Sequence, residues 1–173
     1  LRGLEALGVV EILRFRGARV RRPTAHELLE ANAVRSELES LGARLAVPNM
    51  TDADLSGADL QRANLFHVIL DRSVLDRANL SAANLFGANL IEVRAQGADF
   101  SDAHMKDLLA EGADLTGSRL DRAFIFRGVL IGGRLTGASM RQVVLTGASL
   151  EDADLSGADL SGSLLNGAHL AGT

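Results

Sequence analysis

A five-residue period runs through the chain from residue 55 to residue 170 and restricts the possible folds more than any other feature of the sequence. At every fifth position 18 of 24 residues are leucine, and alanine stands two positions earlier in 15 of these units. Asp or Asn directly precedes the central residue in 10 units, and glycine follows it by two positions in 12. The repeating unit is therefore Ala-(Asp/Asn)-Leu-x-Gly.

A period of five predicts a corner in every unit. It matches neither the period of a helix, about 3.6 residues, nor the two-residue alternation of a strand. Glycine adopts a positive φ without steric penalty, and a type II turn requires a positive φ at its third residue. The recurrent glycine therefore predicts a type II turn that begins at each central residue.

Four such corners close a square, so one coil takes twenty residues. Parallel strands lie about 4.8 Å apart, and about six coils would form a rod roughly 29 Å long. Aromatic residues make up only 3% of the chain, so leucine and alanine must fill the interior. The sequence predicts a mainly β protein, a quadrilateral parallel β-helix of about six coils.

The repeated unit resembles that of the pentapeptide repeat family, whose signature is A(D/N)LXX. The phrase DADLSGADL at Asp52 to Leu60 recurs unchanged at Asp152 to Leu160, five whole coils further on. The resemblance covers residues 51–173, with a possible earlier start at 43–50. It implies that the β-helix is right-handed.

The first fifty residues lack the period and predict two further segments. Thr24 and Glu27 form a capping-box pattern at the start of a helix that ends before Gly42. A short N-terminal α-helical cap over residues 23–45 would cover the open edge of the first coil. The expected division is 1–22, 23–45 and the β-helix at 46–173.

Residues 1–22 are expected to be a strand-like or linker segment, or the remnant of a preceding domain. Apolar and basic residues alternate around Gly17, which indicates a strand or a hairpin. Five arginines lie between Arg14 and Arg22. They would form either a patch for an anionic partner or the solvated face of an edge strand.

Charge and composition exclude several kinds of partner. The net charge is −4, and residues 51–173 carry 10 basic against 16 acidic groups, a net −6. No direct nucleic-acid binding is expected from this balance. No apolar run approaches the roughly 20 residues of a membrane span, so no membrane partner is expected either. The chain has no cysteine, which is compatible with the reducing cytoplasm expected as its location.

The sequence predicts a protein that is not an enzyme and holds no cofactor or metal. None of the phosphate-binding, nucleophile or zinc-binding motifs occurs, and the four histidines lack metal-ligand spacing. The recurrent Asp residues precede turns, where short carboxylates accept hydrogen bonds from nearby backbone N–H groups. Their repetition indicates a structural role.

Hydrophobic residues at outward positions break the polar pattern on two neighbouring faces. One face carries four of the six phenylalanines, and the next carries aliphatic residues; the predicted interaction surface comprises Phe66, Phe86, Phe124, Phe126, Ile91, Ile131, Leu109 and Val129. Large exposed apolar patches usually mark interaction sites. The alternatives are cover by another part of the chain, or an aromatic ladder that only stabilises neighbouring coils.

Residues 91–112 follow the period least well. Ala95 and Ala110 stand at central positions, and Leu108 stands where a small residue is usual. These departures predict a β-bulge or a local distortion.

The expected function is a non-catalytic protein–protein interaction or scaffold module that binds a protein partner, or a second copy, through its apolar faces. The family resemblance implies an alternative, a DNA-mimicking protein that binds gyrase and confers resistance to inhibitors. A second alternative is a targeting arm of a larger multidomain protein, since the chain begins with Leu1 rather than Met.

Overall fold

The computed structural model of the chain describes residues 10–13, 17–20 and 50–173. Strands β1 (Val10–Leu13) and β2 (Gly17–Val20) pair antiparallel, with Val10 opposite Val20. The hairpin predicted around Gly17 is therefore present. The predicted capping helix and the segment boundaries at 22 and 45 lie outside the described residues.

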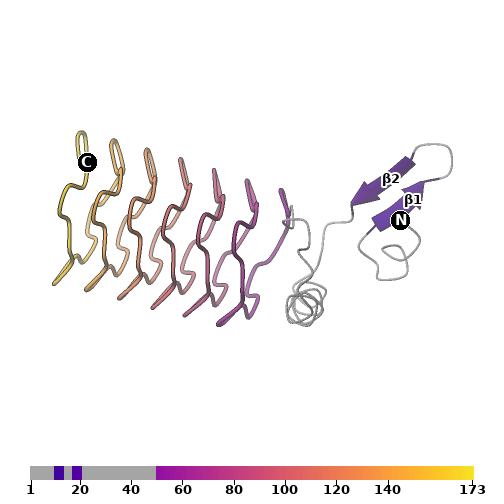
Figure 1. Cartoon of the computed structure of the whole chain (residues 1–173), viewed down its shortest axis with the longest axis horizontal. Coiled ribbons are helices and arrows are strands. Elements are labelled where there is room, and N and C mark those ends of the chain that lie inside the picture. Colours follow the sequence, from indigo (N-terminus) through magenta and orange to yellow (C-terminus); the bar gives the residue numbers. More distant parts are fainter. Residues whose placement is uncertain (1–9, 14–16, 21–49) are drawn as a thin grey trace.

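Residues 50–173 wind into a stack of four-sided coils (Figure 1). The residue before each central position forms a parallel β-bridge with the residue twenty positions further on, as Asn64 does with Asn84. Backbone hydrogen bonds join the coils on both sides of each bridge: Leu55 N donates to Val74 O at 2.7 Å, and Val74 N donates to Ala53 O at 2.8 Å. The predicted twenty-residue, four-sided coil is confirmed.

Every corner has the two features that the predicted turn requires. The carbonyl of a central residue accepts a hydrogen bond from the N–H three positions on, as Leu55 does from Ala58 at 3.0 Å. The residue two positions after the centre has a positive φ at every corner from Asp52 to Gly172. Twelve of these residues are glycine and thirteen are not. Residues with a Cβ adopt this region at a cost of about 1–2 kcal/mol each.

The interior is apolar and is built from the central residues and the small residues two positions before them. Leu115 and Leu135 are 1% and 0% exposed, and they point inward on the same side of the coils. Phe100 is fully buried at a central position. Large and small side chains therefore alternate along the inner surface of each side.

The distortion predicted for residues 91–112 is wrong. Positive φ values occur at Glu92, Gly97, Asp102, Asp107 and Gly112, and the ladder of backbone hydrogen bonds continues without a break.

The register survives because large and small residues exchange places within single units. Leu108 and Ala110 are both buried. Leu108, two positions before the central Ala110, therefore supplies the volume that a central leucine usually supplies. Val93 and Ala95 show the same exchange. The interior is thus filled unit by unit, whichever position supplies the volume.

Candidate functional site

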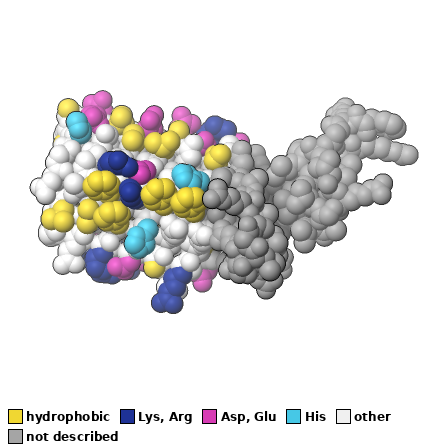
Figure 2. Space-filling view, viewed as in Figure 1, with side chains coloured by type: hydrophobic (Ala, Val, Ile, Leu, Met, Phe, Trp, Pro, Cys, Tyr) yellow, Lys and Arg dark blue, Asp and Glu magenta, His cyan; other side chains and the backbone are white. Residues whose placement is uncertain are grey.

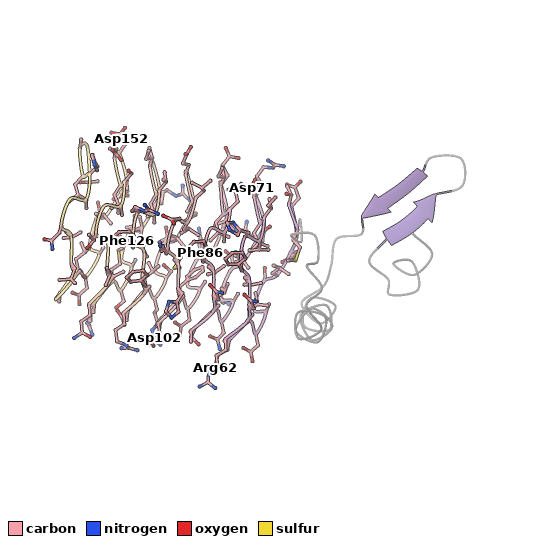
Figure 3. All side chains as sticks on the ribbon, in the orientation of Figure 1. Arg62, Asp71, Phe86, Asp102, Phe126 and Asp152 are labelled. Carbon is pink, nitrogen blue, oxygen red and sulfur yellow. The ribbon has the colours of Figure 1, made fainter. Side chains whose placement is uncertain are left out.

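The predicted aromatic residues lie on one of the four sides of the coils. We call this side the aromatic face and define it as the outward positions directly before and after the central residues 65, 85, 105, 125, 145 and 165. Figure 2 shows hydrophobic side chains in a band along the coils, with basic and histidine side chains among them. Phe86 and Phe126 both lie within it (Figure 3).

Phe66 and Phe86 stack across two neighbouring coils. Their ring centroids lie 5.3 Å apart and their planes differ by 8°. Phe66 is 42% exposed and Phe86 is half-buried. The edge of the His67 imidazole meets both rings, with centroids 4.2 Å from Phe66 and 5.6 Å from Phe86. The rings are thus held in place by a histidine at the adjacent corner.

Phe124 and Phe126 form a second pair on either side of buried Ile125. Their centroids lie 6.0 Å apart with the planes 7° from parallel, and both rings are half-buried. His104 lies 6.5 Å from Phe124, its bridge partner in the next coil. Four of the predicted surface residues therefore form two stacked pairs on one face.

Lys106 joins the two pairs of rings. Its Nζ lies 5.4 Å from the centroid of Phe86 and 5.9 Å from that of Phe126, so the ammonium group contacts a ring on each side. The guanidinium of Arg127 lies 5.3 Å from the Phe126 ring and also binds Asp107, with Nε 2.8 Å from Oδ1. Ring, ring, ammonium and ring thus follow one another along the coils, joined by stacking and cation–π contacts.

The aliphatic residues of the prediction lie on the adjacent face and are less continuous. Leu109 and Val129 are bridge partners in neighbouring coils, the first 40% exposed and the second half-buried. Ile91 is half-buried and Ile131 is 39% exposed, but Glu111 occupies the same position in the coil between them. The structure therefore joins Leu109 to Val129 and separates Ile91 from Ile131.

Outward carboxylates on the remaining sides bind arginines and turns. Asp76 accepts a hydrogen bond from Arg94 at 2.8 Å, and Asp102 binds Arg122 through two bonds of 2.7 Å. Asp154 accepts bonds from Ser156 N at 2.9 Å and from Thr136 Oγ1 at 2.9 Å. These contacts support the structural role predicted for the Asp residues.

Asp114 is the most buried of these carboxylates, at 7% exposure. Burial by itself would raise its pKa, but hydrogen bonds from Thr116, Arg134 and Gln96 outweigh that effect and hold the pKa well below its ordinary value. The bonds from Thr116 Oγ1 and Gln96 Nε2 measure 2.6 Å and 2.7 Å. Asp114 is therefore an ionised structural group rather than a candidate acid catalyst.

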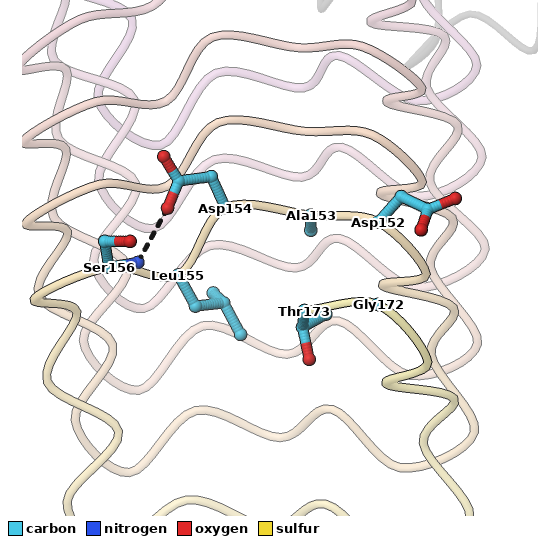
Figure 4. A pocket seen from close by; sticks show the side chains of 7 residues that line it. All are labelled: Asp152, Ala153, Asp154, Leu155, Ser156, Gly172 and Thr173. Carbon is cyan, nitrogen blue, oxygen red and sulfur yellow. Dashed lines mark hydrogen bonds between the residues drawn. The ribbon is translucent and has the colours of Figure 1, made fainter.

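A shallow hollow lies beside residues 152–156 and 172–173. Figure 4 shows its lining, the side of a coil from Asp152 to Ser156 together with Gly172 and Thr173. The Asp154 carboxylate there is engaged by Ser156. Within residues 10–13, 17–20 and 50–173, no three His, Cys, Asp or Glu side chains lie close enough together to hold a metal ion.

No helix long and apolar enough to cross a membrane occurs in the part of the chain that the structure describes.

Sequence reasoning missed the part played by Lys106. The twenty-residue coil places Lys106 in the column between Phe86 and Phe126. From spacing alone, however, a lysine there only interrupts the row of aromatic residues. One signal was available in the sequence: this is the single lysine of the chain, against 17 arginines.

A family model described as pentapeptide repeats matches the chain in eight copies, over residues 49–90, 83–122, 129–162 and 153–173. A trypsin-treated form of QnrB1, a plasmid-mediated fluoroquinolone resistance protein, has a similar structure with a TM-score of 0.53 and 21% identity, over 70% of this chain and 72% of that one. HetL, a pentapeptide repeat protein involved in heterocyst differentiation regulation from the cyanobacterium Nostoc sp. strain PCC 7120, is 30% identical over 72% of this chain and 71% of its own, with a TM-score of 0.40. No curated protein matches the sequence.

Proposed function

Because the chain belongs to the pentapeptide repeat family, whose members fold into right-handed quadrilateral β-helices, we propose that it is a non-catalytic module that binds a protein through its aromatic face. One observation carries the proposal: the outward column of Phe66, Phe86 and Phe126, bridged by Lys106. Aromatic side chains supply much of the binding energy of protein interfaces. The occupant is another protein or a second copy of this chain.

Preorganisation supports this use of the face. The Phe66 and Phe86 rings already stack on each other, and His67 holds their edges. Rings that are fixed before binding lose little conformational freedom when a partner covers them. The same stacking also stabilises neighbouring coils, so the ladder alternative and the binding role use the same contacts. What favours a binding role is that Phe66 remains 42% exposed.

We propose a non-catalytic module because of the chemistry of the outward side chains. The carboxylates with close partners, such as Asp102 and Asp114, are committed to arginines or turn hydroxyls. A reaction site needs unlike groups that converge in a concavity. The proposed setting is the cytoplasm, since a chain without cysteines suits a reducing compartment.

The test places a photo-cross-linking amino acid at Phe86 of the full chain, and at Gln96 on the opposite side as the matched control. We expect adducts from position 86, either with a second copy or with another protein, and few from position 96. Phe66→Asp together with Phe126→Asp should abolish the adducts. Equal yields from positions 86 and 96 would contradict a role for the aromatic face.

Sedimentation of the wild type beside Phe86→Asp/Phe126→Asp identifies the occupant. A dimer that the two substitutions dissociate would make the face an interface between copies. A monomer in both cases, together with adducts at position 86, would make the occupant another protein.

The alternative of a DNA-mimicking gyrase-binding protein has less support. Mimicry of DNA requires a dense anionic surface, and residues 51–173 carry a net −6. Arginines of neighbouring coils, however, neutralise carboxylates such as Asp102 and Asp107. Unchanged gyrase supercoiling at micromolar protein would eliminate this alternative.

A targeting arm of a larger protein would use the same aromatic face.

A further inference from the structure

We infer that the aromatic face docks a polypeptide segment of another protein that presents a carboxylate among apolar side chains, and that Lys106 binds this carboxylate. The inference rests on the proposed function and adds the chemistry of the partner. It follows from the surroundings of Lys106, from the charge of the face, and from the apolar contacts on both sides of the ammonium group.

Among the described residues Lys106 has no carboxylate partner, unlike two arginines close to it. Arg122 and Arg127 each bind an Asp of the preceding coil, at 2.7 Å and 2.8 Å. Among the ion pairs within the described residues, none involves Lys106, and its contacts are with the rings of Phe86 and Phe126. The side chain is only partly exposed. Its charge therefore lies against two aromatic rings, with no carboxylate of the described residues paired to it.

The aromatic face is free of acidic residues although the rod as a whole is acidic. Its twelve outward positions hold no Asp or Glu, and Lys106 is their one full charge; these positions are Asn64, Phe66, Asn84, Phe86, His104, Lys106, Phe124, Phe126, Val144, Thr146, Leu164 and Asn166. Residues 51–173 together carry a net −6. An acidic segment is thus attracted to this face and repelled by the rest of the rod.

The bordering corners add no net negative charge: four of their charged side chains form ion pairs, and Arg62 adds one further positive charge. Asp102 binds Arg122 on one corner, and Asp107 binds Arg127 on the other. The net −6 also opposes a nucleic acid, whose phosphates require a basic surface. A polypeptide segment with a single acidic side chain therefore fits the face better than a polyanion.

The rings explain why the carboxylate should lie among apolar side chains. A partner that covers Phe66, Phe86 and Phe126 excludes water from Lys106, and an ion pair is stronger where water is excluded. Because both ring faces already attract the ammonium group, its position is fixed before the partner arrives. Loss of one partner from such a desolvated pair weakens binding by roughly 30-fold or more.

The test selects ligands from a phage-displayed library of random twelve-residue peptides against the immobilised full chain. We expect enrichment of peptides with Asp or Glu between aromatic or aliphatic residues. A selected peptide is then synthesised with its acidic residue intact and with the amide in its place. Both peptides are titrated against the wild type, Lys106→Met, Lys106→Arg and Arg77→Met.

Arg77→Met is the matched control, since it removes a cation from a corner that does not border the aromatic face. The acidic peptide should bind Lys106→Met at least roughly 30-fold more weakly than the wild type. It should bind Arg77→Met unchanged and Lys106→Arg nearly as well as the wild type. The amide peptide should lose nothing further on Lys106→Met, which shows that the two groups act as a pair.

Three outcomes would overturn the inference. Peptides that Phe86→Asp releases but that bind Lys106→Met as tightly as the wild type would leave the proposed function intact and remove the role of Lys106. Self-association lost in Phe86→Asp but retained in Lys106→Met would make the occupant a second copy. No selected peptide sensitive to Phe86→Asp would contradict the docking of a polypeptide segment, and the cross-linking yield at position 86 would still decide the proposed function separately. Unchanged circular dichroism of each variant shows that it is folded.

Discussion

The imidazole of His67 lies in the space that a side chain on Gly87 would need, and its Nδ1 lies 3.2 Å from the carbonyl oxygen of Gly87, to which it can donate a hydrogen bond. The two residues occupy equivalent corners of neighbouring coils, and both have a positive φ. Glycine is therefore favoured here for two reasons: the backbone conformation of the corner and the ring packed over it.

Replacement of Gly87 by alanine should destabilise the fold more than the same change at a corner with free space. Gly117 has a φ of 64° and free space where a Cβ would lie, so Gly117→Ala should cost about 0.5 kcal/mol, the conformational penalty less the smaller freedom of alanine in the unfolded chain. Gly87→Ala also displaces the exposed His67 ring from its contacts with Phe66 and Phe86. It should therefore cost about 1 kcal/mol more than Gly117→Ala. The free energy of unfolding is measured by denaturant titration.

The His67→Ala background is the control for this displacement. In that background Gly87→Ala should cost no more than Gly117→Ala does. An undiminished cost would show that the ring of His67 is not the reason for the glycine.

Substitution of Ala82 by glycine should stabilise the protein. Ala82 is exposed at a corner with a φ of 56°, where glycine has no steric penalty. The relief of about 1–2 kcal/mol is partly offset by the greater freedom of glycine in the unfolded chain, which leaves a gain of about 0.5 kcal/mol. Ala83→Gly, at a buried position, should instead lower the free energy of unfolding. A loss of stability in Ala82→Gly would show that the positive φ of Ala82 does not strain the folded protein.

Ser118→Ala should raise the free energy of unfolding by about 1 kcal/mol. Ser118 is fully buried, and its Oγ has no hydrogen-bond partner among the described residues. Alanine is the usual residue at this place in the unit, so the change removes a buried polar atom without leaving a large gap. Ser73 provides the contrast, because its Oγ donates to Met50 O at 2.9 Å. Ser73→Ala should therefore gain less than Ser118→Ala, and equal gains would show that the hydrogen bond of Ser73 contributes nothing.

Leu108→Ala and Ala110→Leu should be strongly non-additive. The first change leaves a cavity and should cost about 2–5 kcal/mol, and the second overfills the interior and should cost about 1–3 kcal/mol. The double variant restores the usual order of small and large residues, so its cost should fall at least about 2 kcal/mol below the sum. Costs that simply add would mean that the two positions fill independent volumes.

Stability should fall as the pH drops from about 4 to about 2. The pKa of Asp159 is lowered to about 2 by hydrogen bonds from Ser161 and Arg141, and that of Asp114 is lowered by the bonds that outweigh its burial. A lowered pKa in the folded state contributes stability above the unfolded value, near 4, and loses it as the pH falls through the folded value. Denaturant titrations at pH 6, 4 and 2 measure the loss.

Asp114→Asn should be less stable than the wild type at pH 6, and the difference should shrink at pH 2. Asp152→Asn is the control, since it changes an exposed carboxylate at a corner. A difference between Asp114→Asn and the wild type that does not depend on pH would show that ionisation of Asp114 does not stabilise the fold.

The coils could be predicted from the sequence because every unit presents the same steric problem. The spacing of Leu115 and Leu135 predicts that both point inward on one side, and the recurrent glycine predicts the corner. The bulge predicted near Ala95 and Ala110 was wrong because it judged positions one at a time, whereas the interior responds to the volume of a whole unit.

The aromatic face could be predicted only as a set of outward positions. The period places Phe86, Lys106 and Phe126 in one column, but it cannot give the side-chain conformation that brings the ammonium group over both rings. The contact of His67 with Gly87 could not be predicted either. Glycine occurs at many corners because of their positive φ, so the sequence does not show that one of these glycines also makes room for a side chain.

The bridge from each residue to its counterpart twenty positions on has a consequence for how such a chain can change in length. Gain or loss of a whole coil would shift every later side chain by one strand spacing, about 4.8 Å, and leave it on the same face. Gain or loss of a single five-residue unit would rotate everything beyond it by one side and divide the aromatic column between two faces. Duplication in steps of twenty is thus the mutational route that lengthens the rod and keeps its surfaces in line.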